Sequence, residues 1–282
     1  ETDPIWNEEI YLKLSQIVAE RAQEHLLVAE GLVPTKSILF TGPPGVGKTL
    51  AARWLAKELK RPLLTLDLAA VMSSFLGRTG ANVRYVLDYA KSVESVLLLD
   101  ELDSIAKRRD DSGDVGELKR LVTVLLQEID DWPSSGLLVA ATNHPDLLDP
   151  AVWRRFDMVV SFPMPSQDQT TSLITRLLSS KNIESNQIEI LAVAHHGESF
   201  SEVERDVLRV MREAIVSKEP LEGRLLQMVR DKTKDLPVTQ RKQIASKLRG
   251  MGHSMREVSD WTGVHSVCER VRDAGQRYEE GG

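Results

Sequence analysis

The chain has 282 residues, of which 41% are hydrophobic and 28% charged, and its formal net charge is −6. This length suits about two domains with a sizeable core, and the acidic balance excludes a protein coated throughout with basic residues for nucleic acid. The single cysteine, Cys268, excludes an internal disulfide framework, and no apolar run reaches the roughly 18 residues of a membrane span. We therefore expect a cytoplasmic protein without a membrane segment.

The first part of the chain alternates short apolar runs with amphipathic segments. Apolar residues from Glu8 to about Glu30 recur at helical spacing and predict one helix. Continuous apolar runs separated by helical patterns predict an α/β domain, a parallel sheet with helices on both faces. The predicted strands are 37–41, 63–67, 96–100, 136–141 and 158–162, and the clearest helices between them are 48–59 and 114–129, the second opened by a capping box at Asp114 and Glu117.

Pro163 and Pro165 end this alternation, and the remaining patterns are helical. Helices are predicted at about 166–180, 183–195 and 201–217, then at 241–250 and 254–259, with a turn at 262–264 and a short third helix at 265–272. We predict an α/β domain over residues 1–164, a small all-helical lid over 165–236 and a helical tail over 237–282.

A glycine-rich segment after the first predicted strand has the pattern of a phosphate-binding loop. Gly42-Pro-Pro-Gly-Val-Gly-Lys48-Thr49 matches G-x-x-x-x-G-K-[ST], with a strand before it and a helix after it. The glycines allow backbone N–H groups to face phosphate oxygens, Lys48 supplies a point charge, and the Thr49 hydroxyl coordinates Mg²⁺. A chance match in an ordinary turn is the alternative. The predicted nucleotide-contacting residues are Pro44, Gly45, Val46, Gly47, Lys48, Thr49, Leu50 and Asp100.

Two carboxylates end the third predicted strand. Asp100 follows Val96-Leu-Leu-Leu, and its place at the carboxyl end of a strand puts it on the side of the metal with Thr49. Glu101 is placed to orient and deprotonate an attacking water. Taken alone, Asp100 to Asp103 reads as a solvated acidic turn, but with a phosphate loop some fifty residues upstream it predicts nucleotide hydrolysis.

Together these residues resemble the AAA family of ring-forming ATPases, within the AAA+ group. Ala141–Asp149 resembles the sensor-1 segment, which implies that Asn143 helps hold water near the γ-phosphate of ATP. Ala151–Asp157 resembles the arginine-finger segment, with Arg154 and Arg155 adjacent. In this family the finger comes from the neighbouring subunit, so the resemblance implies a homo-oligomeric ring, usually a hexamer. An Arg–Asp surface network around Asp157 is the alternative.

Phe75-Leu76-Gly77 resembles the family's first pore loop, which grips an extended polypeptide in the central channel. An aromatic side chain can hold any chain by burying area without reading its sequence. The alternative is that Phe75 packs beneath a loop, and Arg78 and Gly80 stand where the family usually has acidic residues.

The resemblance covers about residues 1–217 and implies that Ile5 and Trp6 lie near the adenine. The chain departs from the family pattern at 200–202, where Phe200 and Ser201 replace a small pair and Glu202 occupies the sensor-2 position. His195 and His196 have no Cys and no spaced carboxylate pattern around them, so no metal site is predicted there.

Two functions remain open. The first is an ATP-driven ring motor that remodels, unfolds or threads protein substrates, with a separate protease of the subtilisin-like serine type as a candidate partner implied by the resemblance. The second is a DNA-associated AAA+ switch that uses residues 237–282 as a helix-turn-helix-like module. Residues 224–277 hold twelve Lys or Arg against six Asp or Glu, a local charge of +6 that suits phosphate contacts. The third helix is short and acidic in part, so a packing or docking bundle is preferred over a DNA reader.

Overall fold

The computed structural model describes residues 4–74, 79–104 and 115–264, and its contacts divide the chain into two compact units, Glu1–Met164 and Pro165–Gly282. In the part of the chain that is described, no helix is both long and apolar enough to cross a bilayer.

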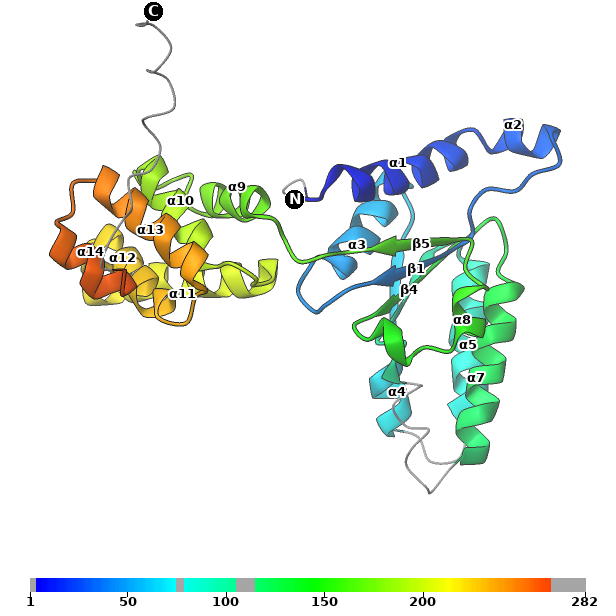
Figure 1. Ribbon diagram of the computed structural model, residues 1–282. Coiled ribbons are helices and arrows are strands. Elements are labelled where there is room, and N and C mark those ends of the chain that lie inside the picture. The colour runs from blue at the N-terminus through cyan, green and yellow to red at the C-terminus, as the bar shows by residue number, and fades with distance from the viewer. Residues whose placement is uncertain (1–3, 75–78, 105–114, 265–282) are drawn as a thin grey trace, which may run out of the picture. The chain divides into compact units, whose positions relative to one another are not determined.

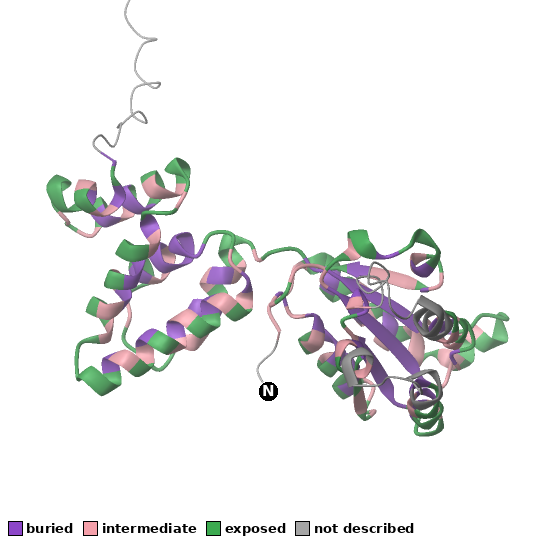
Figure 2. Cartoon of the chain, turned by 90° about the horizontal axis from the view of Figure 1, so that it is seen from below, coloured by how far each residue is buried: buried purple, intermediate pink, exposed green. Residues whose placement is uncertain are grey.

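The first unit is built on a five-stranded parallel sheet in the order β2-β3-β4-β1-β5 (Figure 1). The three central strands are buried almost throughout, whereas the edge strands β2 and β5 are partly exposed (Figure 2). The sheet confirms the predicted fold class, and each strand lies within one residue of its predicted bounds. The strands are β1 (Ser37–Thr41), β2 (Leu63–Asp67), β3 (Val96–Asp100), β4 (Leu137–Thr142) and β5 (Met158–Ser161).

Helices cover both faces of this sheet (Figure 1). Alternate residues of β1 separate the two cores: Phe40 packs with residues of α1 (Glu8–Ala22) and α3 (Lys48–Glu58), whereas Leu39 packs with residues of α5 (Thr79–Ser92) and α7 (Val115–Asp130). Both cores hold the central strands rigidly and leave their carboxyl ends to the loops. The remaining short elements are α2 (Glu24–Ala29), α4 (Leu68–Ser74), the 3₁₀ helix η2 (Pro145–Leu147) and α8 (Pro150–Trp153).

The segment predicted as helical from Glu8 to about Glu30 is helical, but it is divided into two helices, α1 and α2. The structure breaks it at Gln23, which has φ −115° and ψ 26°, and α2 buries none of its residues. Just before this break, the Arg21 guanidinium donates to the carbonyls of Thr35 and Gly136, both at 2.7 Å. These bonds tie the end of α1 to the loops that precede β1 and β4.

The second unit is helical. Serine capping boxes begin three of its helices at Ser166, Ser199 and Ser254, each with Gln or Glu three residues later. The helices predicted from the sequence omit α12, which packs against α10 and α11. The helices are α9 (Gln167–Leu177), α10 (Ser185–Ala194), α11 (Phe200–Ser217), α12 (Leu221–Thr233), α13 (Val238–Gly250) and α14 (Met255–Thr262).

The predicted tail helices α13 and α14 pack inside this unit. Ile244 and Leu248 of α13 are fully buried, and α13 contacts α10 of the predicted lid. Gly263 ends α14 in the left-handed conformation, as the predicted turn requires. The boundary between lid and tail at 236/237 stays a prediction, and the predicted third helix at 265–272 lies outside the described residues.

Candidate functional site

The predicted phosphate loop connects β1 to α3, and its backbone requires glycine. Gly42 has φ +139°, and a Cβ there would lie 2.1 Å from the carbonyl oxygen of Phe162. Gly47 is the N-cap of α3 with φ +100°, and Gly45 also has a positive φ. Because the first N–H groups of an α-helix have no intrahelical partner, the loop presents donors suited to an anion.

The other predicted contacts of this loop differ in what they can offer a ligand. Pro44 and Leu50 are exposed and Thr49 is half-buried, whereas the Val46 side chain is buried in the core beneath α3. Val46 therefore offers only its backbone.

Lys48 is held at the centre of the site by three acceptors. Its Nζ donates to the carbonyl oxygens of Gly42 (2.6 Å) and Pro43 (2.8 Å) and to Oδ1 of Asn143 (2.8 Å). Burial lowers the pKa of Lys48 to about 8, although the nearby carboxylates of Asp100 and Asp103 act in the opposite direction. The sequence-predicted lysine and asparagine thus meet directly.

Asp100 and Glu101 lie where β3 ends. Asp100 Oδ1 accepts the backbone N–H of Glu101 at 2.9 Å. Glu101 has φ +56°, in the left-handed region that non-glycine residues rarely occupy, and it is exposed. Such backbone strain is typical of functional sites. The conformation turns the chain at the end of the strand and leaves the Glu101 side chain accessible.

Asn143 follows β4, the strand between β1 and β3, so it lies between the loop that carries Lys48 and the end that carries Asp100. Its backbone N–H donates to Oδ1 of Asp103 at 3.2 Å. Asp103 is 2% exposed, which contradicts the solvated acidic turn considered for residues 100–103. Asp103 is a residue of the candidate site that the motifs do not predict, and its spacing three residues after Asp100 is its only signal in the sequence.

The two adjacent arginines have different environments. Arg155 forms an ion pair with Asp130, the last residue of α7, whereas Arg154 is exposed and its guanidinium has no polar partner among residues 4–74, 79–104 and 115–264. Asp157 instead accepts the backbone N–H groups of Lys36 (2.9 Å) and Ser37 (3.0 Å). Asp157 therefore binds backbone N–H groups at the start of β1, and the ion pair of Arg155 is with Asp130.

Trp6 lies beside the phosphate loop. A Cβ on Gly47 would be 3.6 Å from Trp6 Nε1, and the Trp6 ring packs edge-on against Trp54 with centroids 5.5 Å apart. This contact anchors the segment before α1 next to the loop. The predicted pore-loop residues Phe75, Leu76 and Gly77 lie outside the described residues.

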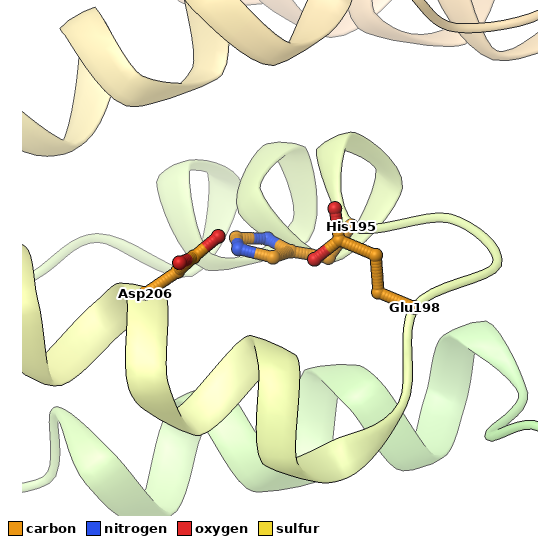
Figure 3. Close-up of side chains that lie close together, drawn as sticks. All are labelled: His195, Glu198 and Asp206. Atoms are coloured by element: carbon orange, nitrogen blue, oxygen red, sulfur yellow. The ribbon is translucent and has the colours of Figure 1, made fainter. Parts of the chain in front are cut away.

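In the second unit, His195 lies between two carboxylates, Glu198 and Asp206 (Figure 3). The sequence shows no spaced carboxylate pattern around His195, but the fold brings these two carboxylates to it. Lys232 of α12 supplies a positive charge to both, since its Nζ lies 2.6 Å from Glu198 Oε1 and 2.7 Å from Asp206 Oδ2. Burial and then the Lys232 charge lower the pKa of His195, against a hydrogen bond with the Leu191 carbonyl that raises it.

Glu202, at the predicted sensor-2 position, caps α11. Its Oε2 accepts the backbone N–H and the hydroxyl of Ser199, both at 2.8 Å. These hydrogen bonds lower the pKa of Glu202. Its contacts are those of a helix-capping residue.

Comparisons with known proteins indicate the family of the first unit. Residues 38–164 match the family described as ATPase family associated with various cellular activities (AAA). An uncharacterized AAA family ATPase of Sinorhizobium fredii is 39% identical over 194 residues, which are 67% of this chain and 57% of that protein. A proteasome-activating nucleotidase of Methanococcus maripaludis is 35% identical over 172 residues, which are 57% of this chain and 42% of that protein. The chain spans about half the length of these curated relatives.

Proposed function

Because residues 38–164 form an ATPase domain of the AAA family, we propose that this protein hydrolyses ATP and uses the energy to remodel, unfold or thread other proteins. One observation carries the proposal: Lys48, Asn143 and the Asp100–Glu101 pair gather at the carboxyl ends of the adjacent strands β1, β4 and β3. Open parallel sheets bind their ligands at this edge.

The residues present fit a magnesium nucleotide. Gly42, Gly45 and Gly47 give the loop its positive-φ backbone, and the N-terminus of α3 favours negative charge. The Thr49 hydroxyl and the Asp100 carboxylate are hard oxygen donors of the kind that Mg²⁺ prefers. Lys48 would exchange its contact with Asn143 for a phosphate oxygen.

Glu101 would take the proton from the attacking water. Its left-handed backbone holds it at the end of β3, and its side chain is accessible rather than packed. Asn143 would orient the same water once Lys48 has turned to the phosphate. When bound, Mg²⁺ would neutralise the charge on the phosphate oxygens.

Arg154 is the better candidate for an arginine finger acting on the nucleotide of a second copy. It is exposed and its guanidinium lacks a polar partner in the described chain, whereas Arg155 is held by Asp130. A site completed by another copy implies a ring, and a hexamer is the size that the family resemblance favours.

The proposed substrate is a protein. The name of the Methanococcus relative, a proteasome-activating nucleotidase, supports an unfolding role, and Phe75, Leu76 and Gly77 would grip the substrate chain. A separate protease is the proposed downstream partner. The DNA-switch alternative has less support, because α13 uses Ile244 and Leu248 to pack inside the helical unit.

The test replaces the proposed base and a matched residue. Glu101→Gln should lower phosphate release by at least about 10²-fold while ATP stays bound, because the base is lost and the binding groups remain. Glu94→Gln is the control, since Glu94 is also an exposed glutamate with positive φ, +48°, in the same unit. Equal turnover in the two variants would refute the role of Glu101.

A further inference from the structure

We infer that Asp103 is a positioning residue for this reaction: its buried carboxylate fixes Asn143, which contacts Lys48 in the free protein and would orient the attacking water once nucleotide is bound. The inference rests on the proposed function and adds to it a residue outside the loop, metal and water contacts. Asp103 would touch neither nucleotide nor water.

The Asp103 side chain is buried. Asp103 is 2% exposed, although it stands in the turn after β3, where the neighbouring Glu101 is exposed. A buried carboxylate is costly unless hydrogen bonds compensate for lost hydration. The hydrogen bonds that the Asp103 carboxylate accepts therefore indicate which part of the site it supports.

The hydrogen bonds of Asp103 lie where β4 ends. Asp103 Oδ1 accepts the Thr142 hydroxyl at 2.9 Å and the Asn143 N–H at 3.2 Å. The paired residues of β3 and β4 end at Leu99 and Ala140, and the Leu102 N–H donates to the Ala141 carbonyl at 2.9 Å just beyond them. The Asp103 side chain adds a further hydrogen-bonded link between the two chain segments beyond these strands, and this link reaches Asn143.

These hydrogen bonds also fix the backbone at Asn143 and at His144, the residue that follows it. The Thr142 hydroxyl, which donates to Asp103, also accepts the His144 N–H at 3.1 Å. The N–H groups of residues 143 and 144 are thus both held by one carboxylate–hydroxyl pair. With its backbone fixed, Asn143 directs Oδ1 at Lys48 Nζ, 2.8 Å away.

A carboxylate that only stabilises the turn would give a different result from one that positions Asn143. If it acts through Asn143, removing it should lower kcat and leave nucleotide affinity nearly unchanged, and the loss should disappear when Asn143 is already gone. Asp103→Asn keeps the size of the side chain and an oxygen that can accept both bonds, so it should restore most of the activity.

The experiment is a double-mutant cycle on the full chain, with kcat for ATP and Kd for ADP measured for each variant. We expect Asp103→Ala to lower kcat roughly 10- to 100-fold, with Kd for ADP within about threefold of wild type. The double variant Asp103→Ala/Asn143→Ala should be no slower than Asn143→Ala alone, and Asp103→Asn should stay within about tenfold of wild type.

Multiplicative losses in the double variant, or equal losses of kcat and ADP affinity, would overturn the inference while leaving the proposed function intact. A wild-type chain that hydrolyses no ATP would overturn both. If Asp103→Ala does not fold, Thr142→Val takes its place in the cycle, because it removes the hydroxyl that joins Asp103 to the His144 N–H. A wild-type kcat in that variant would then refute the inference.

Discussion

Lys48 carries the charge that the proposed phosphate contact needs, and burial sets the pH range over which it keeps that charge. Its pKa of about 8 lies below the ordinary lysine value, so the ammonium is present below pH 8 and is lost as the pH rises above it. We predict that the affinity of the free protein for ATP falls by up to about tenfold per pH unit above pH 8.

Tryptophan fluorescence is a suitable readout between pH 7.5 and 9.5, because Trp6 lies beside Gly47. Lys48→Arg is the matched control: it binds more weakly, but its affinity should not change with pH, since arginine stays charged. An affinity of the wild type that is constant up to pH 9.5 would contradict the assignment of Lys48.

Two glycines with positive φ test the phosphate loop without any ligand. Gly42→Ala should lower the free energy of unfolding by at least about 3 kcal/mol, because its Cβ would overlap the Phe162 carbonyl at 2.1 Å. Gly31→Ala, at φ +75° with nothing within 4 Å of the added Cβ, should cost only about 1 kcal/mol. Similar losses in urea unfolding would show that the Gly42 backbone is not held against β5's end.

Residue patterns indicate the proposed ligand contacts more readily than the residues that support them. Lys48, Thr49 and Asp100 stand in a local motif whose chemistry is readable from spacing alone. Asp103 could not be predicted in the same way, because its partners Thr142 and Asn143 are about 40 residues away and meet it only when β3 and β4 pair.

At the scale of elements, Lys232 joins α12 to α11 and to the turn after α10. Its Nζ contacts Glu198 and Asp206, and hydrogen bonds with Asp206 and Glu198 raise its pKa although burial alone would lower it. Lys232→Met should lower the free energy of unfolding by about 1–3 kcal/mol, because two partly buried carboxylates lose their partner.

Thermal or urea unfolding at pH 7 measures this effect. Lys234→Met, two residues further along at an exposed position, is the control and should change stability by less than about 0.5 kcal/mol. A Lys232 variant as stable as the control would mean that the three charged groups do not stabilise the unit.

The elements followed from the sequence where burial decides the pattern. The central strands are apolar on both faces, and the boxes at Ser199 and Ser254 mark where helices begin. The apolar spacing from Glu8 to Glu30 continues across Gln23, so it did not predict that the segment divides there into two helices. In α2 the same apolar spacing covers no core at all.

The proposed active site depends on a second copy of the chain. The groups that would bind phosphate and activate water lie in the first unit. In the same unit, the Arg154 guanidinium lacks a polar partner within the described chain, whereas Arg155 pairs with Asp130. An arginine that acts on a neighbour's nucleotide would add about 10³- to 10⁵-fold to turnover. The activity should then depend on assembly.

Mixing two inactive variants tests this claim most directly. Arg154→Ala keeps its own Glu101, and Glu101→Gln keeps its Arg154, so each alone should release phosphate at least about 10²-fold more slowly than wild type. An equal mixture should recover up to about a quarter of the wild-type rate, since half of the sites keep Glu101 and half of those face an intact Arg154. Arg155→Ala in place of Arg154→Ala should remain active by itself, within about threefold of wild type. Full turnover by Arg154→Ala alone, or a co-assembled mixture no faster than its components, would contradict an active site shared between copies.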